Sequence, residues 1–283
     1  MSAKRKIKIH IIGAGVSGLI AAKVLEDNGY YPTLIESSDS VGGRIKTLNI
    51  EGYQLDKGFQ VLLTEYPEAK KHLDFKALKL QKFIPGASIF KNNKQYIIGN
   101  PMKNISLLIP TLFSDIGTFA DKLKILKLYL YLRFKSIEKI FLSKEIKTIE
   151  YLKKCEFSNK IINHFFKPFF AGIFLETELS TSSRMFEFVF KMFAQGSVAI
   201  PESGMQEIPK QIAKKLIKTN FIFNTHVDKI SEGEITTKNK IKIKSDYTII
   251  ATEVKNLIDG YNFSSVKWKS CVNFYFETDK KSM

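Results

Sequence analysis

Three glycines with nucleotide-binding spacing follow the first apolar run of the chain. Gly13, Gly15 and Gly18 form the pattern G-x-G-x-x-G, and the acidic Glu36 closes a second apolar run. Gly13 permits a tight turn, Gly15 leaves the backbone open to a pyrophosphate, and Gly18 lets a helix pack closely on a strand. The carboxylate of Glu36 can accept a hydrogen bond from a ribose 2′-hydroxyl group and would repel a 2′-phosphate. This pattern predicts a dinucleotide site.

The elements that would position these residues are a strand over 7–12, a helix over 19–28 and a strand over 32–35. Gly29 is expected to end the helix as a C-cap glycine. Val16 and Ser17 lie between the glycines where the helix is entered, and they are candidate phosphate-binding residues. The N-terminus of a helix offers unpaired N–H groups and the positive end of its dipole to phosphates.

Two other interpretations of the opening stretch remain. It could be a glycine-rich packed turn without a ligand. It could also be a secretion signal, because Lys4, Arg5 and Lys6 precede an apolar run that reaches Ala21 and Ala22, but a signal does not need glycines at this spacing. His10, within a strand expected to be buried, is interpreted as a hydrogen-bonded core histidine.

A second glycine group follows the acid. Gly42, Gly43 and Arg44 are consecutive, and the stretch "YQLDKGFQVL" carries Asp56 and Gly58. Arg44 is a permanent cation with five donors, which suits a pyrophosphate or the edge of a flavin, although it could be a surface arginine. Asp56 could contact a cofactor or only cap a turn.

In the order of these motifs the chain resembles the flavin-dependent amine oxidase superfamily, which includes protoporphyrinogen oxidases and phytoene-type desaturases. Later stretches extend the resemblance: "PESGMQEIPKQIAKKL", "THVDKI" with Val227, and "DYTIIATE" with Ala251 and Thr252. The resemblance implies FAD as the cofactor, with the backbone of Val227 at the adenine and Ala251 near the dinucleotide. It implies an α/β fold in which a Rossmann-like FAD-binding domain, residues 1–85 and 196–260, carries an inserted α+β substrate domain, residues 86–195 and 261–283.

The function implied is an FAD-dependent oxidoreductase that desaturates an apolar substrate by hydride transfer to the flavin. Gln60 stands where some relatives place a histidine, and no catalytic residue is assigned. Family members usually continue into a Gly-Asp segment and a helix that faces the flavin. A second hypothesis is therefore a non-catalytic dinucleotide-binding remnant, or one part of a split enzyme completed by a second chain. A nicotinamide-dependent dehydrogenase is a third, because the glycine pattern alone does not separate the cofactors.

Composition narrows the class of protein. The 283 residues are 44% hydrophobic, which favours a folded chain, and the net charge is +16. The charge could attract an anionic surface or reflect only a lysine-rich composition. No nucleic-acid-binding motif stands out, so no nucleic acid is expected as a partner. Cys155 and Cys271 are far apart, no metal-ligand spacing occurs, and a cytoplasmic protein with a possible contact at the membrane surface is expected.

The middle of the chain has a different pattern. Residues 87–99 predict a hairpin with an Asn-Asn turn, residues 121–141 a helix with an apolar and a lysine-rich face, and residues near 266–277 a strand. The helix could lie on a membrane surface or could be a domain helix with a solvated lysine face. Two clusters of phenylalanines, at 165–174 and 186–193, are expected to be mostly core, with a minority lining an apolar substrate channel.

Overall fold

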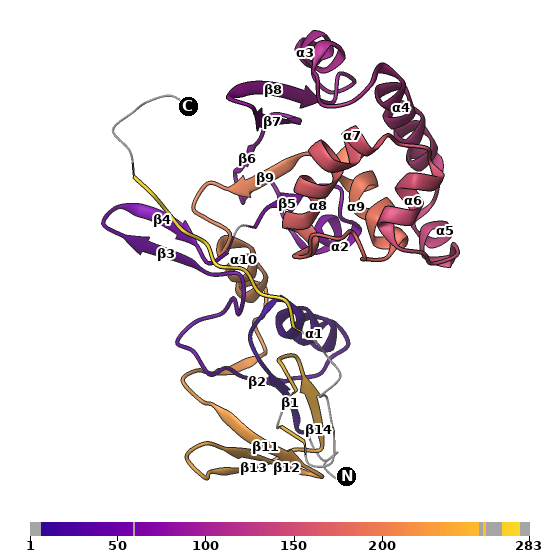
Figure 1. Cartoon of the computed structure of the whole chain (residues 1–283). Helices are drawn as coiled ribbons and strands as arrows, with labels where there is room; N and C mark the ends of the chain where they lie inside the picture. The colour runs from indigo at the N-terminus through magenta and orange to yellow at the C-terminus, as the bar shows by residue number, and fades with distance from the viewer. Residues whose placement is uncertain (1–6, 59, 255–256, 259–267, 278–283) are drawn as a thin grey trace.

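A parallel sheet carries the N-terminal motif. The computed structural model describes residues 7–58, 60–254, 257–258 and 268–277. The sheet has the order β10-β2-β1-β14, and all of its pairs are parallel. Its members are β1 (Ile9–Ile12), β2 (Thr33–Ile35), β10 (Asn220–Ile222) and β14 (Tyr247–Ile250), and α1 (Val16–Asp27) connects β1 to β2 (Figure 1). The α/β fold with a Rossmann-like unit is confirmed.

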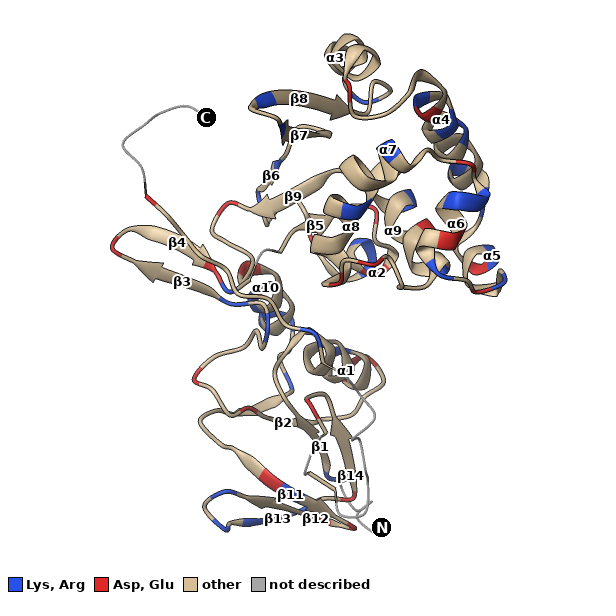
Figure 2. Cartoon of the chain, viewed as in Figure 1, with Lys and Arg blue, Asp and Glu red and all other residues tan. Residues whose placement is uncertain are grey.

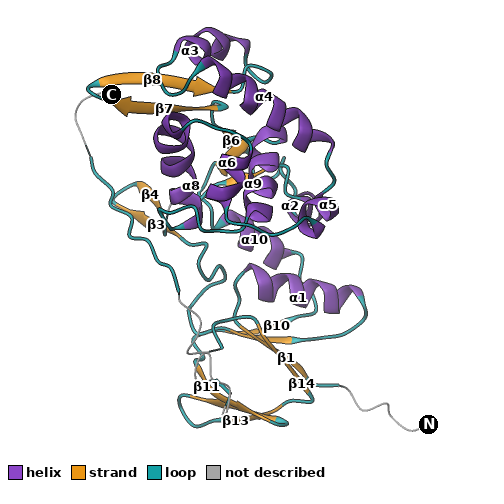
Figure 3. Cartoon of the chain, turned by 45° about the vertical axis from the view of Figure 1, so that its right-hand side comes forward, coloured by secondary structure: helices purple, strands orange, loops and turns teal. Residues whose placement is uncertain are grey.

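Alternating side chains of this sheet pack on two different layers. Ile11 and Leu34 face α1 and α10 (Glu207–Lys214). Ile12 and Ile35 face an antiparallel meander on the other side. The meander consists of β11 (Val227–Ser231), β12 (Glu234–Thr237) and β13 (Lys242–Lys244). Because both faces are covered, β1 is buried along its whole length, and Figure 3 shows the sheet between α1 and the meander.

His10, the polar residue in β1, has a hydrogen-bonding partner. His10 is 7% exposed, and its Nδ1 lies 2.8 Å from Oγ of Ser245. Burial lowers the pKa of His10, with a further lowering from the nearby charge of Lys8. This is the core histidine that the sequence indicates.

A second group of strands joins the sheet to the helical part of the chain. β3 (Thr47–Ile50) and β4 (Tyr53–Asp56) form a hairpin. Further along, a three-stranded antiparallel sheet has the order β5-β9-β6. Its strands are β5 (Leu62–Leu63), β6 (Leu80–Lys82) and β9 (Val198–Pro201), with α2 (Pro67–His72) between the first two in the chain. Thus residues far apart in the sequence are held together beside α10.

The helical part has its own core, built around Phe166, Phe170 and Phe186, which are at most 1% exposed. A hairpin of β7 (Gly86–Lys91) and β8 (Lys94–Gly99) borders it; its turn is formed by Asn92 and Asn93 with φ of +51° and +57°, as predicted. The other elements are η1 (Ile105–Leu107), α3 (Leu108–Phe113), α4 (Phe119–Phe134), α5 (Ile137–Leu142), α6 (Thr148–Lys154), α7 (Asn159–Ile161), η2 (Ile162–Phe166), α8 (Lys167–Phe174) and α9 (Ser183–Gln195).

Two expectations about this part are wrong. The single helix over 121–141 is two helices, because Lys135 leaves the helical conformation and the side chain of Ser136 caps α5 by accepting a hydrogen bond from the N–H of Lys139. The strand expected near 266–277 is absent from residues 268–277, which pair with no strand in the described part of the chain. Residues 261–267 and 278–283 lie outside the described residues.

Candidate cofactor-binding site

The first glycine turn leaves β1 at the carboxyl edge of the parallel sheet. Gly13 has a φ of +103°, and its N–H donates to the carbonyl of Ile35 at 2.8 Å. A Cβ atom at Gly13 would lie 3.1 Å from the carbonyl oxygen of Ala251 and 3.2 Å from Cβ of Thr252. The structure therefore brings Ala251 and Thr252, at the end of β14, against the glycine turn.

Helix α1 begins directly after this turn, three residues earlier than the predicted start at Leu19. Its N-cap is Gly15, which provides no side-chain hydrogen bond, and no acidic residue lies in its first turn. The N–H groups of Val16 and Ser17 therefore lie at an uncapped positive helix end. This end can receive a phosphate group.

The packing of α1 on the turn depends on Gly18, and the substitution Gly18→Ala tests it. A Cβ atom at Gly18 would lie 1.9 Å from the carbonyl oxygen of Gly13, which is backbone and cannot rotate away. We expect the variant to lose more than about 2 kcal/mol of unfolding free energy in urea denaturation, because backbone must shift. The control is Gly29→Ala at the other end of α1: Gly29 has a φ of +82° and open space around it, so the cost should stay near 1 kcal/mol. Equal losses would contradict the close approach.

The second glycine group lies against the first. The N–H of Gly42 donates to the carbonyl of Ala14 at 3.0 Å. Gly42 and Gly43 have φ values of +137° and +59°, and a Cβ atom at Gly43 would lie 3.2 Å from Cα of Gly15. Two loops from different parts of the sequence thus form one surface of bare backbone. Such a surface lets a pyrophosphate approach main-chain N–H groups closely.

Glu36 directly follows β2 beside this surface and is 7% exposed. Its Oε2 accepts a hydrogen bond from the N–H of Ala14 at 2.7 Å, and its Oε1 accepts one from the N–H of Ser38 at 2.8 Å. Burial by itself raises the pKa of Glu36, but these hydrogen bonds outweigh it and hold the pKa below its ordinary value. The carboxylate is therefore ionised at neutral pH, and Oε2 keeps a lone pair for a ribose hydroxyl group.

The segment before β11 runs beside Glu36. The N–H of Glu36 donates to the carbonyl of Ile222 at 2.9 Å, and the N–H of Thr225 donates to the carbonyl of Glu36 at 2.9 Å. Val227 begins β11 two residues later and is 6% exposed. This places Val227 near Glu36. A contact between the backbone of Val227 and an adenine stays a prediction.

Arg44 reaches out of the second glycine loop, where its side chain is 75% exposed. Its Nη2 lies 3.0 Å from Oε1 of Glu253, and its guanidinium lies 5.5 Å from the ring centre of Trp268. Nearby, Nε2 of Gln60 donates to the carbonyl of Arg44 at 3.1 Å, while Oε1 of Gln60 is buried without a hydrogen-bond partner among the described residues. A buried acceptor of this kind calls for a donor, which a bound ligand can provide.

The side chain of Asp56 forms hydrogen bonds with other residues of the protein. Its Oδ1 accepts hydrogen bonds from Oγ1 of Thr47 at 2.5 Å and from the N–H of Met205 at 3.0 Å. It thereby ties the β3–β4 hairpin to the turn before α10. Gly58 follows with a φ of +88°. The structure gives Asp56 a role in holding the loops together, and direct contacts of Asp56 and Gly58 with a cofactor stay predictions.

Sequence reasoning missed Gln206, which is 8% exposed and links three segments. Its Nε2 donates to the carbonyl of Val41 at 3.1 Å, its Oε1 accepts from the N–H of Thr47 at 3.2 Å, and its N–H donates to Oγ1 of Thr47 at 3.0 Å. It therefore positions the residue before Gly42. No local pattern around Gln206 indicates this, because its partners lie far away in the sequence.

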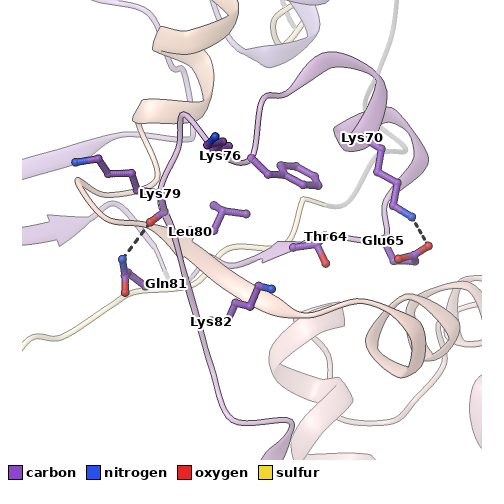
Figure 4. Close-up of a pocket in the computed structure, with 9 residues that line it drawn as sticks. Thr64, Glu65, Lys70, Lys76, Lys79, Leu80, Gln81 and Lys82 are labelled. Carbon is purple, nitrogen blue, oxygen red and sulfur yellow. Dashed lines mark hydrogen bonds and ion pairs between the residues drawn. The ribbon is translucent and has the colours of Figure 1, made fainter. Parts of the chain in front are cut away.

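The cavity in Figure 4 is separate from this site. It has a volume of about 600 Å³ and lies between α2 and β6. Its lining includes Lys70, Lys76, Lys79 and Lys82 but no residue of either glycine group. Among the described residues, no cluster of side chains could hold a metal ion, and no helix is long and apolar enough to cross a membrane.

The residues that are present fit a dinucleotide. The uncapped end of α1 and the bare backbone of Gly15 and Gly43 suit a pyrophosphate, and the ionised Glu36 suits a ribose. The second loop also carries the exposed guanidinium of Arg44, and Gln60, whose Oε1 is unpartnered among the described residues, is hydrogen-bonded to the carbonyl of Arg44.

Comparisons with known proteins agree with this geometry. Residues 16–279 match the model of the family described as flavin containing amine oxidoreductase. Protoporphyrinogen oxidase 2 of Arabidopsis thaliana is 26% identical over 170 residues, covering 58% of this chain and 32% of the relative. The L-amino-acid oxidase of Sistrurus catenatus edwardsii is 33% identical over 98 residues, covering 35% of this chain and 18% of the relative.

A solved structure shows the same fold. An oxidoreductase from Methanosarcina mazei superposes with a TM-score of 0.64 at 19% identity, covering 86% of this chain and 58% of that one. The chain thus spans about a third of the plant relative and less than two thirds of the solved structure. Together with the match of the family model over most of the sequence, the paired glycine loops and Glu36 show that the chain belongs to the flavin-containing amine oxidoreductases, a family of FAD-dependent enzymes.

Proposed function

We propose that this chain binds FAD and takes part in the oxidation of an apolar substrate by hydride transfer. The observation that carries the proposal is the meeting of two glycine loops beside a buried, ionised glutamate at the carboxyl edge of a parallel sheet. In open α/β sheets this edge is where ligands bind. Bound FAD would supply the two-electron acceptor, and the protein would bind and orient it.

Different residues of the site would bind different parts of the cofactor. Glu36 would accept a hydrogen bond from the adenosine ribose, and the N–H groups of Val16 and Ser17 would meet the pyrophosphate. Arg44 and Gln60 would lie towards the flavin. The substrate would lose a hydride to the cofactor and a proton to solvent, and it would gain a double bond.

The apolar substrate is argued from the aromatic end of α8. Nζ of Lys269 donates to the carbonyl of Phe174 at 3.2 Å, and the adjacent Trp268 lies under Arg44. The segment 268–277 therefore links the end of α8 to the second glycine loop. Phe169 and Phe174 on this helix are only partly buried. Aromatic surface is therefore available near Arg44, which would lie towards the flavin. Protoporphyrinogen, after which the plant relative is named, suits such a surface better than an amino acid does.

Anaerobic reduction of bound flavin tests the proposal. Protein loaded with FAD is mixed with protoporphyrinogen, with a carotenoid precursor or with an L-amino acid, and the visible flavin absorbance is followed. We expect bleaching with an apolar compound and none with the amino acid. Bleaching by the amino acid alone would overturn the substrate class, and a folded protein that retains no flavin would overturn the whole proposal.

A further inference from the structure

Large apolar side chains are exposed on α4, on α3 and on η1, the short helix that leads into α3. Ile105, Ile109 and Phe113 recur every four residues and are 75%, 68% and 84% exposed. On α4, Leu123, Leu130 and Phe134 share one side and are 53%, 43% and 83% exposed. Helices α3 and α4 lie at the same end of the helical part in Figures 1 and 3. We call these six residues the α3–α4 face.

This face is not needed by the core of the helical part. Helix α4 packs inward through a different stripe, in which Asp121, Leu128 and Leu132 are at most 5% exposed. The α3–α4 face lies on the opposite side of the helix, by the helical period. Helix α4 is thus a helix of this domain, packed through Leu128 and Leu132, while Leu123, Leu130 and Phe134 of the apolar side expected from the sequence are exposed. Large apolar side chains that are exposed and that the core does not use indicate an interaction site.

The charged side chains around α4 indicate which kind of partner would bind there. Residues 119–142 contain six basic and two acidic side chains. Of the two acids, Asp121 is buried and accepts hydrogen bonds from the N–H groups of Thr118 and Ser158. Lys127 and Arg133, on the exposed part of α4, form no ion pair with any described residue. Figure 2 shows α3 without charged residues and blue basic residues along α4.

We propose that the α3–α4 face rests on an anionic lipid surface. The six apolar side chains would enter the boundary between headgroups and acyl chains, while Lys127 and Arg133 would meet lipid phosphates. A second copy of the chain fits less well, because a symmetric contact would bring the same unpaired cations together. The contact is peripheral, since no described helix can cross a membrane. It does not depend on the proposed function.

Sedimentation with vesicles tests this contact. The full chain is mixed with vesicles of phosphatidylcholine and phosphatidylglycerol, or of phosphatidylcholine alone, and the bound fraction is measured after centrifugation. We expect binding to the anionic vesicles that weakens with salt. Phe113→Ser with Phe134→Ser should weaken it at least about tenfold, because each phenyl ring loses an apolar environment. Lys127→Gln with Arg133→Gln should weaken it about fivefold per charge.

The matched control is Ile217→Ser with Phe276→Ser. These side chains are 83% and 90% exposed but lie outside α3 and α4, so vesicle binding should not change. Circular dichroism checks that every variant is folded. Absence of binding by the folded wild type, an unchanged Phe113/Phe134 variant, or an equal loss in the control would overturn the proposal. A dimer in gel filtration that the Phe113/Phe134 variant abolishes, without vesicle binding, would replace the lipid by a second copy.

Discussion

Replacing Gly15 by alanine is expected to leave the fold intact and to weaken binding of FAD and of ADP about ten- to a hundredfold. The φ of Gly15 is −69°, which any residue can adopt, and a Cβ atom there would meet only Cα of Gly43 at 4.0 Å. The same methyl group would stand in the bare backbone surface between the two glycine loops. It would hold the pyrophosphate away from charge-assisted hydrogen bonds that are each worth about 1.5–3 kcal/mol.

Isothermal titration calorimetry measures the affinity, and urea denaturation measures the stability. Gly29→Ala is the control, because it changes a glycine of the same helix away from the site. If Gly15→Ala binds ADP as tightly as the wild type does, the surface between the loops does not hold the phosphates. If Gly15→Ala instead loses stability as Gly18→Ala should, the measured loss of affinity would reflect the fold.

Glu36→Ala should lower both affinity and stability. Besides the ribose contact, the variant loses the hydrogen bonds to the N–H groups of Ala14 and Ser38, so we expect about 1–3 kcal/mol less unfolding free energy together with weaker ADP binding. Thr33→Ala, in β2 three residues before Glu36, is the control for binding. A folded Glu36→Ala protein with unchanged affinity would show that the acid only supports the glycine turn.

The pH dependence of stability gives Glu36 a second test. Its pKa is lowered in the folded protein below the value of 4.5 that it has when unfolded. The stabilisation it provides is therefore present above pH 4.5 and is lost as the pH falls through the folded pKa. Urea denaturation of the wild type and of Glu36→Gln should give curves that differ most at neutral pH and converge in acid. Parallel curves would contradict the hydrogen-bonded carboxylate.

The sequence predicts those elements that depend on residues close together in the chain. The unit β1–α1–β2 follows from Gly13, Gly15, Gly18 and the apolar runs, and the Asn92–Asn93 turn follows from two residues that tolerate positive φ. Helix α1 begins three residues before the start that the sequence predicts, because Val16 to Gly18 belong to both the turn and the helix. The break at Ser136 had a signal in its N-cap side chain, but the apolar period continues across it.

Contacts between distant segments could not be predicted in this way. The approach of Gly43 to Gly15, the hydrogen bonds of Gln206 to Val41 and Thr47, and the contact of Asp56 with Met205 depend on how the loops fold back. The orientation of α4 was equally hidden. Its apolar residues occupy two opposite sides, and only packing decides which side faces the core.

The most direct test of the FAD site compares FAD, ADP and FMN in one titration series on the wild-type chain. The site described here holds the adenosine and pyrophosphate through Glu36, Gly15 and Gly43. We therefore predict that FAD binds, that ADP competes with it, and that FMN, which lacks the adenosine, binds far more weakly. Binding of FMN as tight as that of FAD, or a folded protein that binds none of the three, would contradict the account.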